Sequence, residues 1–237
     1  MVIPQSQRVS AVGRLLGQLG GATIALIMSA GCQTMPMQTG ADAPLLWNTG
    51  VRDHGPQLAA FMADEEPAVA APLGFMAFCL RNPDQCSAPA DQPQTVELDP
   101  QLWQKLQDVN DHINHSVTNE DDKAHFGRYE YWTIVTDGFG DCEDFALTKR
   151  KELIDAGLPE KALRIAIVKT WRDELHAVLT VSTDHGDYVL DSRSAEILPW
   201  NRTEYRWISR QDANDPRGWI ALGRYPIKIA TAGTRAR

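Results

Sequence analysis

The chain has 237 residues, of which 43% are hydrophobic, so it is long enough to bury one good core with a small appendage. Its formal net charge of -8 argues against nucleic acid as a general partner, because such a surface needs an excess of Lys and Arg. Charges of both signs are mixed along the chain, as on an ordinary soluble protein surface.

The N-terminal stretch has the form of an export signal. Arginines precede an apolar run rich in small residues from Leu15 to Ala30, which is too short and too rich in glycine for a membrane span. Cleavage after Gly31 suits an ordinary signal peptide, whereas Ala30, Gly31 and Cys32 resemble a lipobox in which Cys32 is lipidated. Both alternatives predict a periplasmic protein, and membrane contact only through the lipid anchor.

Export to an oxidising compartment changes what the four cysteines mean. Cys79 and Cys86 are seven positions apart across a turn-rich segment, so they are natural disulfide partners. If Cys32 is lipidated or removed, Cys142 remains as a lone thiol. It is therefore a candidate for reactivity, with an inert buried cysteine as the alternative.

The segments ahead of the predicted catalytic domain are irregular in composition. Residues 32–72 are rich in Ala, Pro, Gln and Asp and predict a tether that wraps the core, while Leu73 to Leu80 is an apolar stretch expected to dock on it. The predicted organisation is an export signal at 1–31, the tether at 32–72, one domain at 73–230 and a loose tail at 231–237.

The first firm element is a helix that begins at Asp99-Pro100, an N-cap followed by a favourable first-turn proline. Apolar residues then recur at helical spacing as far as Val117. His112 and His115, three positions apart, are expected on its solvated face and not at a metal. The acidic loop from Asn119 to Asp122 has the chemistry of a calcium ligand set but lacks the alternation of an EF-hand.

The stretch from Gly138 to Lys149, GFGDCEDFALTK, predicts a glycine lead-in and then a helix. Asp141 has N-cap chemistry, and Asp144 three positions later makes an acidic capping box. Cys142 then lies at the positive end of the helix dipole, which favours the thiolate. The three carboxylates, including Glu143, oppose ionisation of the thiol, so a bound cation becomes a serious candidate.

Four strands are expected after this helix: Leu163 to Trp171, Leu175 to Ser182, Asp187 to Asp191, and an aromatic-rich strand from Leu198 to Arg210. A further apolar stretch runs from Trp219 to Leu222. The first of these strands is largely apolar and is expected in the centre of the sheet.

Thiol catalysis needs a base beside the thiol and a third group that orients the base. His176 opens the second strand and Asp191 closes the third, so a hairpin centred near residue 184 sets them nearly opposite one another. If the helix start packs against that end, Cys142, His176 and Asp191 form a triad. The alternatives are an ordinary edge histidine and a turn-forming aspartate.

Two other histidines are weaker candidates for the base. His185 lies in the turn and is expected to be solvated, and His125 has no matching carboxylate that we can place.

Several motifs together resemble the bacterial transglutaminase-like cysteine proteinase family, which includes the periplasmic LapG-type proteases. They are GDCEDFALTKRKEL, HAVLTV and YVLDS, with VNDHIN upstream and ILPW downstream. The resemblance covers roughly residues 73 to 222. It implies an α+β fold with a papain-like or transglutaminase-like core, its nucleophile at a helix N-terminus packed on an antiparallel sheet.

The resemblance also implies a cysteine peptidase with Cys142, His176 and Asp191 as catalytic residues and a protein substrate in the envelope or at the surface. LapG-type members depend on calcium, which implies calcium at Asp141 and Glu143, with Asp144. The alternative is that Asp141 and Asp144 only cap the helix.

One departure separates this chain from the LapG-type pattern. A Thr-Pro-x-Glu segment and a longer approach precede GDCED in that group, whereas Thr133 to Asp137 is all that stands here. Because this loop borders the expected cleft, the substrate and the calcium requirement stay open, and so does a membrane-bound regulator, which is not carried over. The remaining functional alternatives are a transglutaminase or amidase that uses the same acyl-enzyme, and a binding module without activity.

Overall fold

The computed structural model describes residues 55–63 and 67–222. The predicted signal at 1–31, Cys32, most of the predicted tether and the predicted tail at 231–237 lie outside these residues. Among the described residues, no helix is both long enough and apolar enough to cross a lipid bilayer.

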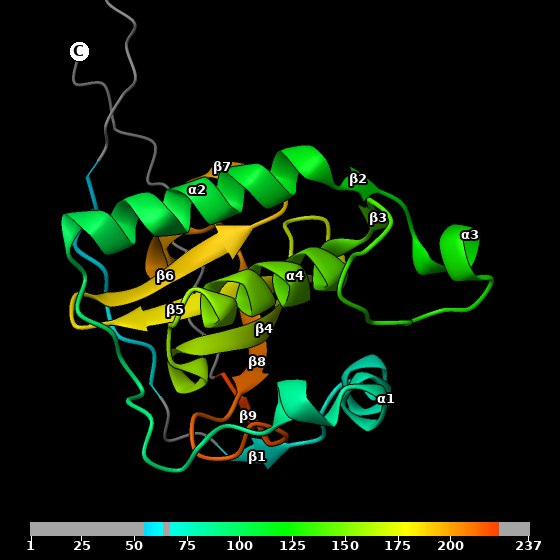
Figure 1. Ribbon diagram of the computed structural model, residues 1–237, viewed down its shortest axis with the longest axis horizontal. Coiled ribbons are helices and arrows are strands. Elements are labelled where there is room, and N and C mark those ends of the chain that lie inside the picture. The colour runs from blue at the N-terminus through cyan, green and yellow to red at the C-terminus, as the bar shows by residue number, and fades with distance from the viewer. Residues whose placement is uncertain (1–54, 64–66, 223–237) are drawn as a thin grey trace, which may run out of the picture. The chain divides into compact units, whose positions relative to one another are not determined.

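A seven-stranded antiparallel sheet forms the centre of the molecule, in the order β1-β9-β8-β4-β5-β6-β7 (Figure 1). The strands are β1 (Ala68–Val69), β4 (Leu163–Lys169), β5 (Leu175–Thr183), β6 (Gly186–Asp191), β7 (Ser194–Pro199), β8 (Arg206–Gln211) and β9 (Trp219–Ala221). The strand that the sequence predicts to be central, β4, holds the middle position.

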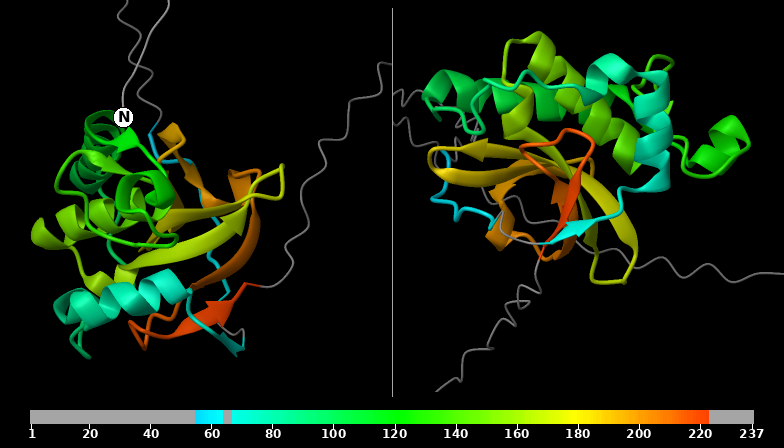
Figure 2. Two further views of the ribbon diagram at one scale, coloured as in Figure 1. Left: turned by 90° about the vertical axis from the view of Figure 1, so that its right-hand side faces the viewer. Right: turned by 90° about the horizontal axis from the view of Figure 1, so that it is seen from below.

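Helices α1 (Leu73–Arg81), α2 (Pro100–Ser116) and α4 (Cys142–Asp155) cover one face of this sheet (Figures 1 and 2). The short helix α3 (Asp122–Phe126) lies to the side, next to the two-stranded pair of β2 (Thr118–Asn119) and β3 (Phe139–Gly140). The short 3-10 turns are η1 (Pro83–Cys86), η2 (Glu160–Ala162) and η3 (Trp200–Arg202). The main core lies between α2, α4 and the sheet, and it includes Leu106, Leu153 and Leu179. The antiparallel sheet with helices on one face is the α+β architecture that the sequence predicts.

The aromatic-rich segment from Leu198 to Arg210 is not the single strand that the sequence predicts. β7 ends at Pro199, the chain turns through η3, and β8 begins at Arg206. Proline has no backbone N–H to donate to a ladder, so the strand ends there. Trp200 and Trp207 then pack edge to face, with ring centroids 5.9 Å apart, in a second core on the other face of the sheet.

The predicted disulfide between Cys79 and Cys86 is present and joins α1 to η1. α1 in turn supports the segment that precedes α4. Phe75 packs edge to face on Trp132, and the Arg81 guanidinium donates to the Trp132 carbonyl at 2.7 Å. The N-terminal described residues also contact the sheet: the backbone N–H of Met62 donates to the buried carboxylate of Asp187. The predicted start of the domain at residue 73 stays a prediction.

Candidate active site

α4 begins where the sequence predicts, with Asp141 as its N-cap, Cys142 as its first residue and Asp144 completing the capping box. The preceding Gly140 is required by space, since a Cβ there would lie 2.8 Å from the Asp144 Cβ. The first N–H groups of a helix have no partner inside it, so the helix start presents free donors around Cys142.

Cys142 lies directly against β5. Its Sγ accepts a hydrogen bond from the backbone N–H of Ala177 at 3.4 Å and donates to the Glu143 carboxylate at 3.1 Å. Burial raises the pKa of the Cys142 thiol, and the negative charge of Glu143 raises it further. Among the described residues, Cys142 is the one free cysteine. The thiol is therefore held in its protonated form against the backbone of Ala177, the residue that follows His176 in β5.

His176 and Asp191 meet at the end of β5 and β6. The His176 Nε2 lies 2.8 Å from the Asp191 Oδ1, and only 1% of the His176 surface is exposed. The Nδ1 of His176 is also buried, and no residue in the described part of the chain hydrogen-bonds to it. The imidazole thus has one nitrogen anchored by a carboxylate and the other available for proton transfer.

The hairpin register differs from the predicted one by two positions. Thr183 pairs with Gly186 and Leu179 with Leu190, so Asp191 is a diagonal neighbour of His176 and not its direct partner. Diagonal neighbours share one face of a sheet and lie within reach of long side chains, so the contact still forms.

Asp191 is held by two further donors. The Tyr205 hydroxyl donates to its Oδ2 at 2.5 Å, and the backbone N–H of Arg193 donates to its Oδ1 at 2.9 Å. Burial by itself raises the pKa of Asp191, but the hydrogen bonds from His176 and Tyr205 outweigh it and the pKa is lowered. Asp191 therefore remains a carboxylate. Tyr205 was not predicted from the sequence, because it lies in the segment that was expected to be one strand.

Carboxylates gather at the start of α4 in two groups that share Asp141. One group joins Asp141 with Cys142 and Glu143, and the other joins Asp141 with Asp122 and Asp144. The sequence predicts Asp141, Glu143 and Asp144 as ligands; the structure brings Asp122 of the acidic loop to the same place.

The fold of the loop explains the position of Asp122. Strand β2 (Thr118–Asn119) pairs in parallel with β3 (Phe139–Gly140), and the Glu120 N–H donates to the Gly140 carbonyl at 2.9 Å. The loop after α2 is thereby tied to the lead-in of α4.

The carboxylates of this cluster lie close to one another without a neighbouring positive charge that balances them among the hydrogen bonds and ion pairs of the described residues. The pKa of Asp144 is raised to about 8 and that of Glu143 to about 9, mainly by burial and in addition by the neighbouring Asp141. Burial also raises the pKa of Asp122. The Oδ1 atoms of Asp122 and Asp141 are buried, and neither has a hydrogen-bond partner among the described residues. Buried oxygens of this kind fit a hard divalent cation such as Ca²⁺.

None of the other histidines among the described residues belongs to these two groups. His112 and His115 are exposed on α2, and neither belongs to a metal-ligating cluster within residues 55–63 and 67–222. His125 pairs with Asp137 at 2.9 Å, and His185 lies in the turn beside Asp184.

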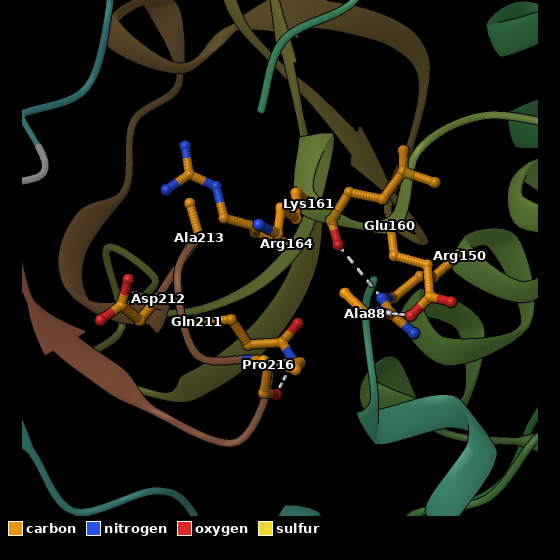
Figure 3. Close-up of a pocket in the computed structure, with 10 residues that line it drawn as sticks. Ala88, Arg150, Glu160, Lys161, Arg164, Gln211, Asp212, Ala213 and Pro216 are labelled. Atoms are coloured by element: carbon orange, nitrogen blue, oxygen red, sulfur yellow. Dashed lines mark hydrogen bonds and ion pairs between the residues drawn. The ribbon is translucent and has the colours of Figure 1, made fainter. Parts of the chain in front are cut away.

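Two hollows lie near the sheet. One is an open groove of about 310 Å³ beside Asp191 and Tyr205, lined also by the β4–β5 connection, where Trp171 is exposed. The other, shown in Figure 3, lies beside Arg150, whose guanidinium pairs with Glu160 at 3.2 Å. The first hollow borders the site at Asp191 and Tyr205, and Cys142 and His176 are not among the residues that line it.

Three solved structures of Legionella pneumophila LapG are similar to the chain, each with a TM-score of 0.45. The calcium-bound form is 26% identical, covering 57% of this chain and 77% of LapG. The EGTA-treated form is 28% identical, covering 55% of this chain and 73% of LapG. No curated protein matches.

The family model of the bacterial transglutaminase-like cysteine proteinases (BTLCP) matches residues 65–225, which is more than half of the chain. The chain belongs to the bacterial transglutaminase-like cysteine proteinase family.

Proposed function

We propose that the chain hydrolyses peptide bonds in a protein substrate through Cys142, His176 and Asp191. One observation carries the proposal: the Cys142 Sγ rests on the N–H of Ala177 while the adjacent His176 is anchored to Asp191 through Nε2. The thiol thus lies at a helix N-terminus against the backbone next to His176, and the buried Nδ1 of His176 has no partner among the described residues, which supports the pairing of base and thiol that thiol catalysis needs.

The reaction is acyl transfer in two stages. The Nδ1 of His176 takes the proton of the Cys142 thiol, and the thiolate attacks the scissile carbonyl carbon. The backbone N–H of Cys142 donates to the resulting oxyanion. His176 then protonates the leaving amine as the C–N bond breaks, and water activated by His176 releases the acid and restores the thiol.

Asp191 and Tyr205 set the orientation of the base. The carboxylate accepts from Nε2, so it fixes the tautomer of His176 and stabilises the imidazolium that forms. The open groove that borders Asp191 and Tyr205 supports a binding place for the substrate on that side of the site.

We propose that calcium binds at the start of α4, held by Asp141, Glu143 and Asp144 together with Asp122. The buried oxygens without partners and the raised pKa values of these carboxylates support the site. A cation held by these carboxylates would offset the negative charge that opposes the Cys142 thiolate. The calcium-bound and EGTA-treated forms of the LapG relative support the choice of metal.

We propose the periplasm as the compartment, with an envelope or surface protein as substrate. The disulfide between Cys79 and Cys86 supports an oxidising compartment. The export signal at 1–31 and lipidation of Cys32 rest on the sequence alone.

The test uses the chain without residues 1 to 32, a library of peptides and mass spectrometry. The native chain with calcium should release fragments, and Cys142→Ala and His176→Ala should each abolish release while circular dichroism stays native. Undiminished release by either variant contradicts the triad. If an added amine is incorporated in place of water, the enzyme is a transglutaminase.

A further inference from the structure

The turn that follows Asp191, between β6 and β7, is short, and residues of α2 hydrogen-bond to its backbone. Asp191 pairs with Ser194, so only two residues join β6 to β7. The side chain of Asp191 is held by His176 and Tyr205, but those bonds do not fix the backbone from which it projects.

Two asparagines of α2 bind that backbone. Asn114 Nδ2 donates to the Asp191 carbonyl at 2.9 Å and to the Ser194 carbonyl at 3.1 Å. Asn110 Nδ2 donates to the Ser194 carbonyl at 3.0 Å and to the Ala195 carbonyl at 3.2 Å. The two amides are four residues apart, so they project from one face of the helix. Together they bind both ends of the turn.

A buried lysine completes the arrangement. Lys149 of α4 is fully buried, and its Nζ donates to the Asn110 Oδ1 at 2.8 Å. Because Lys149 is the donor in this bond, the Asn110 oxygen faces Lys149 and the Asn110 NH₂ faces β7. Lys149 follows Cys142 by seven residues, which is two helical turns, so both project from the same face of α4.

We propose that Lys149, Asn110 and Asn114 form a clamp that positions Asp191, and through it His176, relative to Cys142. One rigid helix, α4, contacts the site at two places: Cys142 rests on β5, and Lys149 reaches the Asp191 turn through Asn110. The clamp rests on the proposed function. Its members are positioning residues, because none of them contacts the reacting atoms.

The experiment removes the clamp contact nearest to Asp191. Asn114→Ala is compared with Gln104→Ala, which removes an exposed amide of the same helix whose side chain donates to Asp108. Asn114→Ala should lower kcat by about 10- to 100-fold with KM unchanged, since outer contacts of a catalytic group act through its position. Gln104→Ala should match the native chain. Lys149→Met serves as a second variant if Asn114→Ala does not fold.

A double-mutant cycle separates positioning from general destabilisation. In an Asp191→Ala background, Asn114→Ala should cause no further loss of kcat, because the residue it positions is absent. An equal loss in both backgrounds, or native kcat in both clamp variants, overturns the proposal.

Alkylation of Cys142 by iodoacetamide, followed by peptide mapping, provides a readout that needs no substrate. The rate should fall in Asn114→Ala and stay native in Gln104→Ala. If the native chain releases no peptide fragments, the proposed function fails, and the alkylation rates still test the clamp.

Discussion

Replacing Asp122 by asparagine tests the calcium site most directly. The pKa of Asp144 is raised from 3.8 to about 8, so at pH 7 the folded chain without metal holds this group protonated while the unfolded chain ionises it. At pH 7 the solution lies about 3 pH units above the unfolded pKa of 3.8. Keeping Asp144 protonated over this interval costs roughly 4 kcal/mol of stability, since one unit is worth about 1.4 kcal/mol. A cation that offsets this cost stabilises the folded chain.

The assay is thermal unfolding at pH 7 in calcium and in EGTA. At a calcium concentration one hundred times Kd, the folded state gains about 2.7 kcal/mol, which raises Tm by roughly 5–10 °C for a domain of this size. Asp122→Asn removes one ligand and one buried charge. Its Tm in EGTA should therefore rise above the native value, and most of the calcium-dependent increase should be lost.

A matched control is Asp155→Asn, which removes an exposed carboxylate of α4 that pairs with Lys151. It should keep the full calcium-dependent increase. If Asp122→Asn keeps that increase as well, Asp122 is not a ligand. If the native chain shows no increase, the calcium site is refuted altogether. Calorimetric titration tests the pH dependence of calcium binding. The affinity should increase as pH rises, because calcium displaces protons from carboxylates with raised pKa values.

The remaining predictions concern the triad, the buried lysine and the disulfide. Tyr205→Phe removes one donor to Asp191 and should lower kcat by about tenfold. A hydrogen bond to a charged group is worth roughly 1.5–3 kcal/mol, and only part of this energy is lost in the transition state. An unchanged kcat contradicts the role of Tyr205. Burial lowers the pKa of Lys149 from 10.5 to about 7. Between these two pH values the unfolded chain therefore binds one more proton than the folded chain. The free energy of unfolding should rise with pH in this range by up to about 1.4 kcal/mol per pH unit. Lys149→Met should abolish that part of the slope in urea unfolding at pH 7 and pH 9, and an identical slope in both proteins argues against a neutral lysine. Replacing Cys79 and Cys86 by serine should cost about 2–3 kcal/mol in urea unfolding because the closed loop is short, and full stability would show that α1 docks without the bond.

The sequence by itself determined the elements whose signals are local. The cap at Asp141, the first-turn proline after Asp99 and the apolar run of β4 depend on neighbouring residues. Each begins in the structure where it was predicted, although β4 ends at Lys169, two residues before the predicted end at Trp171. The disulfide between Cys79 and Cys86 belongs to the same class, because its partners are seven residues apart.

Only the tertiary structure decided which distant groups meet. Asp122 reaches the carboxylates at the start of α4 through the β2–β3 pairing, and Tyr205 reaches Asp191 because the chain turns at Pro199. The two-position shift of the hairpin likewise follows from pairing of whole strands and not from the residues of the turn alone. Contacts between residues far apart in sequence depend on packing and register, so no local pattern in the chain specifies them.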